Sequence, residues 1–232
     1  MFCIICGAKI QDDAKFCIFC GTSLRENQPT CPHCNSKLDK SPERKTKCSS
    51  CKNDIYVRKK QNIFGSVFLA KNDAIASDYF NTISGYGLNE ADYFRKYEQL
   101  KNRFKTQPNS LDVIWGLFND LILEHYKLND LQFLVSIHYT QALFLDQQNK
   151  GFYHVLKQSR KMELQYIKKN QISQYVEISG AGGCIECKNI EGRKYPIDVA
   201  LKEMPLPVRN CKFKLNSERG FCRCMYLAVF DD

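Results

Sequence analysis

The 232-residue chain lacks any apolar run near the roughly 20 residues that a membrane-spanning helix needs. Its start, Met1 to Ile10, also lacks the charged segment and the long apolar segment of a secretory signal. We therefore expect a soluble, cytoplasmic protein with no membrane partner. Because thiols stay reduced in that compartment, disulfide bonds are disfavoured for its cysteines.

Histidine is scarce as well: the chain has four, and residues 155–232 contain none. This absence disfavours a ββα-metal nuclease of the His-Asn-His type, which needs a histidine general base. The Glu-x-x-His pairs of di-iron helical bundles are missing too. We interpret His125, His138 and His154, which fall in separate predicted helices, as side chains at the edge of the core.

Cysteine, in contrast, is abundant, with 13 residues. Eight of them form four Cys-x-x-Cys pairs near the start: Cys3 and Cys6, Cys17 and Cys20, Cys31 and Cys34, and Cys48 and Cys51. Structural zinc sites take four ligands in a tetrahedron, and two intervening residues let one tight turn place both sulfurs on one ion. The pattern therefore predicts two structural zinc ions in this stretch.

Each pair begins a similar short unit. In such a turn the position after the second cysteine favours positive φ, which glycine and asparagine adopt most easily. That position holds Gly7, Gly21, Asn35 and Lys52. An apolar residue also stands four positions after each second cysteine: Ile10, Leu24, Leu38 and Ile55. We expect these apolar side chains to pack beside the sulfurs.

An internal repeat assigns the pairs to ions. Residues 6–10, Cys-Gly-Ala-Lys-Ile, match residues 34–38, Cys-Asn-Ser-Lys-Leu. We infer that each repeat begins with the Cys-x-x-Cys pair that ends in this motif. We assign the ligands as two sets: Cys3, Cys6, Cys17 and Cys20, then Cys31, Cys34, Cys48 and Cys51. The stretch resembles the double zinc ribbon family over about the first 55 residues. The resemblance implies metal binding and a small zinc-stapled fold, without implying a particular function.

The formal net charge of +9 supports a nucleic-acid partner less than it first suggests. A zinc ion with four thiolates carries a charge of −2, so three such centres would lower the net charge to +3. A local basic set remains in the second ribbon and just after it: Arg44, Lys45, Lys47, Arg58, Lys59 and Lys60. These are our candidate nucleic-acid contacts, and a solvated linker is the alternative interpretation.

Between residues 61 and 171 the cysteines stop and the apolar spacing becomes helical. The pattern predicts a bundle of about five helices, over 64–82, 89–105, 111–125, 131–143 and 151–169. Asn109 and Asp130 stand where helix caps are expected. The many phenylalanines and tyrosines of this region recur at helical spacing, and we interpret them as core residues.

From Ile172 the pattern changes to a small module of strands, turns and a short helix. Its predicted elements are a strand over Tyr175–Ser179, a glycine turn over 180–183, a helix from Val199 to Met204 capped by Asp198, and a strand from Met225 to Phe230. The glycine turn lacks the Lys-Ser/Thr of a phosphate-binding loop.

This module contains five cysteines: Cys184, Cys187, Cys211, Cys222 and Cys224. They cannot all bind one tetrahedral ion. Cys184 and Cys187 form the firm pair, and two of the other three should complete a third zinc site. Cys222 and Cys224, two apart on a predicted strand, would point the same way. Replacement of either one by Cys211 is equally feasible, so the leftover cysteine is not assigned.

The order of motifs in the module is similar to the cysteine-rich tail of phage head-morphogenesis proteins of the Mu F type. The shared motifs are Cys-x-x-Cys, Gly-x-x-Tyr-Pro-Ile-Asp, Pro-x-Pro, a single Cys, and Cys-Arg-Cys. The His-Pro that usually precedes the last motif is absent here. The resemblance covers about 45 residues and implies a metal-stapled module on a phage or mobile-element protein.

The sequence thus predicts a mainly α protein with small zinc-stapled β modules. The expected parts are zinc ribbons over 1–26 and 27–60, a helical bundle over 61–171 and an α+β zinc module over 172–232. We expect a non-enzymatic adaptor that binds a macromolecular partner, with a protein as the first choice. A nucleic-acid-binding regulator that uses the basic second ribbon and linker is the alternative, and a phage structural or morphogenesis protein is another.

An enzyme is the least supported of the hypotheses. It would depend on a free Cys211 as nucleophile, or on Glu186 beside a zinc ion. A nucleophile of this kind needs an adjacent base, and the sequence indicates none for either residue.

Overall fold

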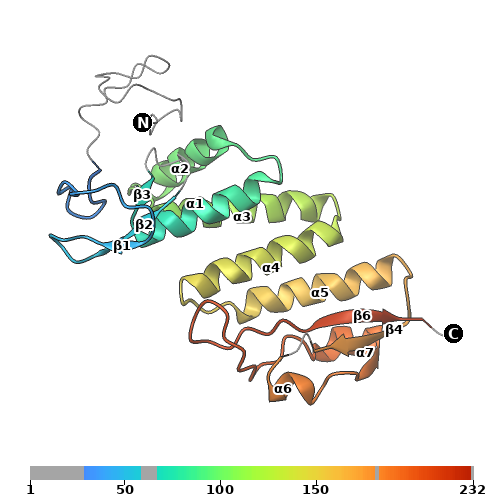
Figure 1. Cartoon of the computed structure of the whole chain (residues 1–232). Coiled ribbons are helices and arrows are strands. Elements are labelled where there is room, and N and C mark those ends of the chain that lie inside the picture. The colour runs from blue at the N-terminus through green and yellow to red at the C-terminus, as the bar shows by residue number, and fades with distance from the viewer. Residues whose placement is uncertain (1–28, 59–66, 181–182, 231–232) are drawn as a thin grey trace, which may run out of the picture. The chain divides into compact units, whose positions relative to one another are not determined.

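The computed structural model describes residues 29–58, 67–180 and 183–230 (Figure 1). The cysteines of the first ribbon, together with Lys59 and Lys60, lie outside these residues. The chain divides into two compact units, Met1–Ile114 and Trp115–Asp232. The division falls inside one helix, α3 (Ser110–Lys127), so the predicted bundle helices contribute to both units.

The first unit contains a small antiparallel sheet of β1 (Thr46–Lys47), β2 (Asp54–Val57) and β3 (Phe68–Leu69) in that order. Two helices follow, α1 (Lys71–Ser84) and α2 (Glu90–Phe104), and α1 contacts both β2 and β3. The prediction of a helix from residue 64 is wrong at its start. Phe68 and Leu69 are buried and extended, and they pair with Val57 and Tyr56 of β2.

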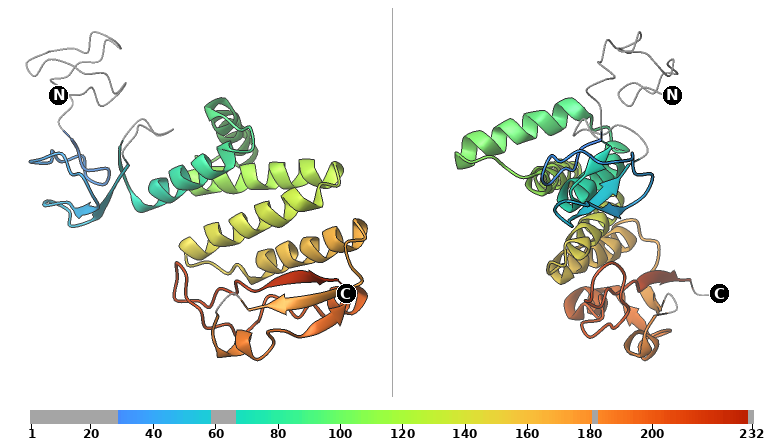
Figure 2. Two further views of the ribbon diagram at one scale, coloured as in Figure 1. Left: turned by 45° about the vertical axis from the view of Figure 1, so that its right-hand side comes forward. Right: turned by 60° about the vertical axis from the view of Figure 1, so that its left-hand side comes forward.

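The second unit holds the rest of α3 and two long helices, α4 (Leu131–Gln147) and α5 (Tyr153–Lys169). Its sheet consists of β4 (Tyr175–Ser179), β5 (Lys194–Pro196) and β6 (Met225–Val229) in the antiparallel order β5-β4-β6. Two short helices, α6 (Ile185–Lys188) and α7 (Ile197–Glu203), complete the unit. Figures 1 and 2 show α5 lying between α4 and the sheet, in agreement with its contacts to α4, β6 and α7.

Side-chain caps set the starts of three helices, and two of them, Asn109 and Asp130, are the caps that the sequence predicts. Asn89 and Asp92 form a capping box at α2. Asn109 accepts a hydrogen bond from the amide of Asp112 at 2.9 Å, and Asp130 accepts one from the amide of Phe133 at 3.1 Å. Such caps satisfy backbone amides that have no partner within the helix.

One large hydrophobic cluster forms the core of the second unit and joins α4, α5, the sheet and the cysteine-bearing loops. Phe221 is fully buried there, with its ring 4.8 Å from that of Phe152 and 5.7 Å from that of Tyr139. The interpretation of the aromatic residues as core holds for Phe118 and Phe144, which are buried. It is wrong for Phe94 and Phe104, which are more than half exposed.

The histidines differ in their surroundings. His138 is buried, and its Nε2 lies 3.5 Å from the hydroxyl of Tyr126. Burial lowers the pKa of His138. His125 lies beside Asp130, with 3.0 Å between Nδ1 and Oδ2, and His154 is exposed. The described helices do not bring these side chains together as a metal-ligand group.

The short helix α7 starts earlier than the sequence pattern indicates. It begins at Ile197, directly after Pro196, and the expected cap Asp198 lies in its first turn. The Asp198 carboxylate pairs instead with Lys168 of α5. Within the described residues, none of the helices has both the length and the apolar character needed to cross a membrane.

Candidate metal centres

Two matching turns carry the cysteines of the second ribbon. In each turn the amide after the second cysteine donates to the carbonyl of the first, Asn35 to Cys31 at 2.9 Å and Lys52 to Cys48 at 3.0 Å. Asn35 has a φ of 57° and Lys52 a φ of 62°. The predicted positive φ after the second cysteine is therefore confirmed at both described turns.

The thiols of these two turns converge. The Sγ atoms of Cys31, Cys34, Cys48 and Cys51 all lie within 4.8 Å of one another. Cys31 and Cys51 are 3.7 Å apart, and Cys34 and Cys48 are 3.8 Å apart. A tetrahedral zinc ion with Zn–S bonds of about 2.3 Å requires sulfur atoms about 3.8 Å from one another. The spacing of the thiols therefore fits a four-thiolate zinc centre.

Hydrogen bonds favour the thiolate form at part of this centre. The pKa of Cys48 is lowered to about 5, chiefly by the backbone amide of Cys51 and the side chain of Ser36. The Ser36 hydroxyl lies 3.0 Å from Cys34 and also lowers the pKa of that thiol. Burial raises the pKa of Cys31 to about 11. Since zinc binds thiolates, a bound ion would supply the positive charge that a buried Cys31 thiolate needs.

A small apolar cluster packs beside the sulfurs. Ile55 and Phe68 are buried with Cys31 and Cys48, and Leu38 packs against them. Leu38 and Ile55 are the apolar positions that the repeated turn predicts, and the structure confirms their place. A cluster of this size buries little apolar surface, so a metal ion bound by the four thiols would contribute much of the stability of this ribbon.

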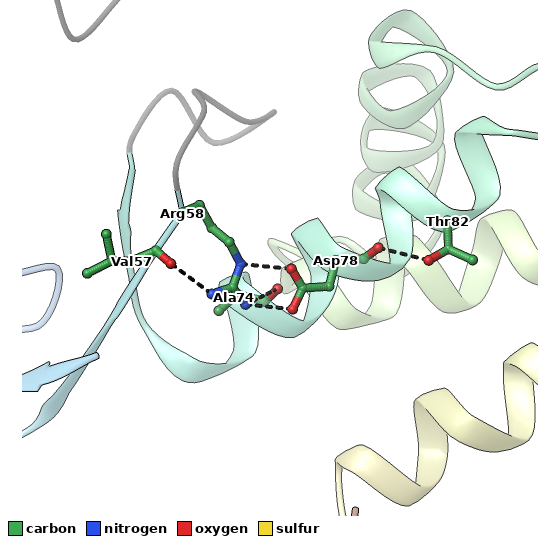
Figure 3. Close-up of polar contacts among 5 residues, drawn as sticks. All are labelled: Val57, Arg58, Ala74, Asp78 and Thr82. Carbon is green, nitrogen blue, oxygen red and sulfur yellow. Dashed lines mark hydrogen bonds and ion pairs between the residues drawn. The ribbon is translucent and has the colours of Figure 1, made fainter. Parts of the chain in front are cut away.

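Arg58, one of the candidate nucleic-acid contacts, makes several contacts within the protein. Its Nε and Nη2 atoms donate to the two carboxylate oxygens of Asp78 in α1, at 2.7 and 2.6 Å (Figure 3). The same guanidinium donates to the carbonyls of Val57 and Ala74 at 3.1 and 3.3 Å (Figure 3). Arg58 therefore ties the ribbon to α1, and its donors are used within the protein.

The other described candidates for nucleic-acid contact remain on the surface. Arg44 and Lys47 are exposed. Lys45 pairs with Asp54 at 2.8 Å and lies over the ring of Tyr56, 4.8 Å from its centre. Lys45 is thus partly occupied by neighbours, whereas Lys47 is one of the residues that line a hollow on the ribbon.

A hollow of about 360 Å³ lies between the second ribbon and the start of α1. It is lined by His33, Lys47, Lys52, Asn53, Asp54, Tyr56 and Lys71. Sequence analysis missed Lys71, because its approach to the ribbon depends on β3 folding back onto β2. His33 is not among the grouped metal ligands, and its Nε2 lies 2.9 Å from the carbonyl of Asp54.

The five C-terminal cysteines form two triangles that share Cys187. In the first, the sulfur atoms of Cys184, Cys187 and Cys211 are separated by 3.8, 3.8 and 3.7 Å. In the second, those of Cys187, Cys222 and Cys224 lie within 4.8 Å of one another. The first triangle has the edge length of a tetrahedral zinc–thiolate centre, about 3.8 Å.

Different segments position these thiols. Cys184 and Cys187 lie at the start and within α6, and the amide of Lys212 donates to the sulfur of Cys184 at 3.2 Å. The expectation that Cys222 and Cys224 stand on a strand is wrong, because β6 begins only at Met225. Both are nevertheless buried. The residues just before Cys222 belong to a loop and not to the sheet.

A buried carboxylate holds that loop. Asp146 of α4 is fully buried and accepts hydrogen bonds from the amide of Asn216, at 3.0 Å, and from the hydroxyl of Ser217. The backbone also comes very close at Gly220, where an added Cβ would overlap the carbonyl oxygen of Cys211. The loop before Cys222 is therefore in direct backbone contact with the segment that carries Cys211.

The C-terminal thiols differ in their acidity. Burial opposes the thiolate form of Cys184, but the amides of Lys212 and Cys187 outweigh it, and the pKa of Cys184 falls to about 6. A hydrogen bond from Cys224 lowers the pKa of Cys222 to about 6. Burial raises the pKa of Cys211 to about 11. This mixture fits a site in which a cation stabilises the buried thiolates.

Comparison with known proteins adds evidence for the part of the chain before residue 29. Residues 2–24 match the family model of a zinc-ribbon domain. The matched span contains Cys3, Cys6, Cys17 and Cys20, and it covers a small part of the chain. The comparison with curated proteins and the comparison with solved structures give no match. The family match and the thiol clusters together support zinc binding by this chain.

Proposed function

We propose that the chain is a zinc-binding, non-enzymatic adaptor that presents small zinc-stapled modules to a macromolecular partner. The observation that carries this proposal is that the described residues of each compact unit contain a thiol cluster. Each cluster has sulfur separations that fit tetrahedral zinc. The thiolate-only ligand sets are of the kind found in structural zinc sites, whereas catalytic zinc keeps an open position.

Exposed apolar side chains on the second unit support a protein partner. On β6, Met225 and Leu227 are 41% and 47% exposed and alternate with the buried Tyr226. They therefore lie on the outer face of the sheet, and Phe230 just beyond the strand is 70% exposed. Apolar groups gathered on one face of a soluble protein are typical of contact surfaces.

Zinc content and partner capture test the adaptor proposal. Mass spectrometry of the native full-length chain should show bound zinc, and a chain that contains none would contradict the proposal. For the partner, a double variant, Met225→Glu with Leu227→Glu, should lose a protein that the wild type captures from a lysate. The matched control, Gln132→Glu with Gln158→Glu, adds the same charge at exposed positions of α4 and α5 and should retain it. Equal capture by both variants would contradict a role for β6.

A nucleic-acid partner is the second candidate, and the hollow beside the second ribbon favours it. Three lysines, Lys47, Lys52 and Lys71, line it together with His33 and Tyr56, and the Lys52 ammonium donates to the carbonyl of Ser49 at 2.7 Å. Ammonium groups neutralise phosphates, and an aromatic side chain among them suits the bases of a single strand. Asp54 also lines the hollow, but its carboxylate is paired with Lys45.

Titration with single-stranded and duplex nucleic acid at two salt concentrations tests this second candidate. Binding that falls steeply between about 50 and 200 mM salt would support it, because release of counterions from phosphates causes that dependence. Reversal of charge at Lys47 and Lys71 should abolish the binding. The control Lys37→Glu and Lys40→Glu changes two exposed lysines of the same ribbon that do not line the hollow. No binding at the lower salt would exclude this candidate.

A further inference from the structure

The C-terminal thiols differ from those of the second ribbon in how many of them meet at one point. In the ribbon, four Sγ atoms all lie within 4.8 Å of one another. At the C-terminal centre the thiols form two groups of three that share Cys187, and among the described residues no fourth ligand atom lies that close to every member of either group. Structural zinc takes four ligands. Each C-terminal group therefore suits an ion that three thiolates satisfy.

We propose that this centre binds two copper(I) ions, one in each group of three, and that the thiolate of Cys187 bridges them. Copper(I) is a soft ion that thiolate ligands select, and three thiolates complete its coordination. One ion takes Cys184, Cys187 and Cys211, and the other takes Cys187, Cys222 and Cys224. Five thiols thus satisfy two copper(I) ions. The inference goes beyond the zinc binding proposed above, which a zinc-loaded ribbon alone satisfies.

The burial of the thiols favours three ligands over four. Cys187, Cys222 and Cys224 are each at most 2% exposed, so water is poorly placed to serve as a fourth ligand of their group. Beside the other group, the carboxylate of Glu186 faces Lys212, with 3.9 Å between Oε1 and Nζ. The same burial protects copper(I), which is stable against water and oxygen only where its ligands shield it.

Backbone amides stabilise the negative charge of the centre. Two copper(I) ions leave part of the charge of five thiolates uncompensated, so the sulfurs need hydrogen-bond donors. The amide of Lys212 donates to the sulfur of Cys184 at 3.2 Å, and the amide of Val208 donates to that of Cys222. Hydrogen bonds to a charged form favour that form in a buried site. Donors therefore reach both groups of three.

Metal counting on the full-length chain tests the proposal. The reduced, zinc-loaded chain is titrated with copper(I) without oxygen, in the presence of the copper(I) chelator bicinchoninate, and native mass spectrometry counts the bound ions. The chain should take up two copper(I) ions and keep the zinc of its ribbons. Uptake of fewer than two, displacement of ribbon zinc instead, or a zinc ion at the C-terminal centre that copper(I) does not displace would each overturn the proposal.

X-ray absorption at the copper edge gives the coordination directly and needs no variant. Each copper ion should have three sulfur neighbours and a second copper ion at short distance, because the two ions share one thiolate. Two or four sulfur neighbours, or the absence of a neighbouring copper ion, would contradict the assigned geometry.

Serine variants identify the bridge. Cys187→Ser should lose both copper ions, whereas Cys211→Ser and Cys224→Ser should each lose one. The double variant of Cys211 and Cys224 should bind no copper, so this pair distinguishes two ions from one even where Cys187→Ser does not fold. Equal losses in the three single variants would rule out a bridge at Cys187.

The ribbon provides the internal reference. Cys48→Ser should remove one zinc ion and leave both copper ions in place, because its thiol belongs to a separate cluster. A chain that binds copper(I) but no zinc contradicts the proposed function and leaves this inference standing. A chain that binds zinc alone contradicts this inference and leaves the adaptor proposal standing.

Discussion

The two described thiol clusters differ in what surrounds them. The cluster of the second ribbon is built from two matching turns, and the apolar residues beside it are few. The C-terminal cluster is built from one Cys-x-x-Cys turn and two separate segments, and it borders the large core of the second unit. In the ribbon a bound metal ion would take the place of a core, whereas in the second unit it would be added to one. The two clusters should therefore respond differently to the same change.

Removal of zinc should give the largest difference. Chelation, or Cys48→Ser, should unfold residues 29–58, since binding of a structural zinc ion supplies about 10–16 kcal/mol in small zinc domains. Helices α3 to α5 should persist, because their packing does not depend on the ribbon's ion. Limited proteolysis would locate the cuts, and circular dichroism would report the helices.

The control for this experiment is Ser50→Ala, an exposed position in the same turn as Cys48. It should keep the ribbon protected from protease. Loss of most of the helical signal on chelation would show that zinc also organises the helices, and the contrast between the two clusters would then be wrong.

Removal of a buried core side chain should, in contrast, destabilise the second unit and leave the ribbon folded. Phe221→Ala should lower the free energy of unfolding of the second unit by about 3–5 kcal/mol, because a fully buried ring leaves a cavity. Urea unfolding followed by fluorescence of Trp115, the single tryptophan, would measure it. Phe230→Ala, at a 70% exposed position, is the control and should change stability little. An equal effect of the two variants would contradict the assigned core.

The tie between the ribbon and α1 should have a moderate effect. Arg58→Ala and Asp78→Ala should each destabilise the first unit, and their double-mutant cycle should give a coupling of about 1 kcal/mol. Thermal unfolding of the four zinc-loaded proteins would supply the cycle. The exposed pair Lys45 and Asp54 is the matched comparison and should couple more weakly. Strict additivity at Arg58 and Asp78 would contradict the bidentate contact.

The smallest expected effect is a gain in stability. Lys52→Gly should stabilise the zinc-loaded ribbon by about 1 kcal/mol, because glycine adopts positive φ without the steric cost that lysine has. Competition with a chelator should then show zinc bound about fivefold more tightly. Asn35→Gly, at the equivalent position of the other turn, should gain less, since asparagine tolerates this conformation. A loss of affinity in Lys52→Gly would contradict the assigned backbone strain.

Local chemistry made much of this protein predictable. A Cys-x-x-Cys turn prescribes its own geometry, so the positive φ at Asn35 and Lys52 and the packing of Leu38 and Ile55 followed from spacing. Cap residues such as Asp130 lie next to the helices they begin, and the strand Tyr175–Ser179 was bounded by a glycine turn. In each case the deciding residues are neighbours in sequence.

The remaining features depended on contacts distant in sequence. The segment at Phe68 has a helix-like pattern, yet pairing with β2 makes it a strand. Arg58 sits in a basic run, yet Asp78 twenty residues later takes its donors. The place of Cys211 beside Cys184 depends on how the loop after α7 returns to α6. No local sequence pattern predicts these contacts between distant residues. The spacing of the C-terminal cysteines therefore did not determine which of them would lie together.

The contact at Gly220 has a consequence for which sequences this module tolerates. No side chain fits there, since its first carbon would overlap the carbonyl of Cys211. In a library that samples every amino acid at every position, Gly220 should therefore be as intolerant as the cysteines around it, although it carries no chemical group. The structure of the centre thus depends on a position where the residue must lack a Cβ atom, as only glycine does.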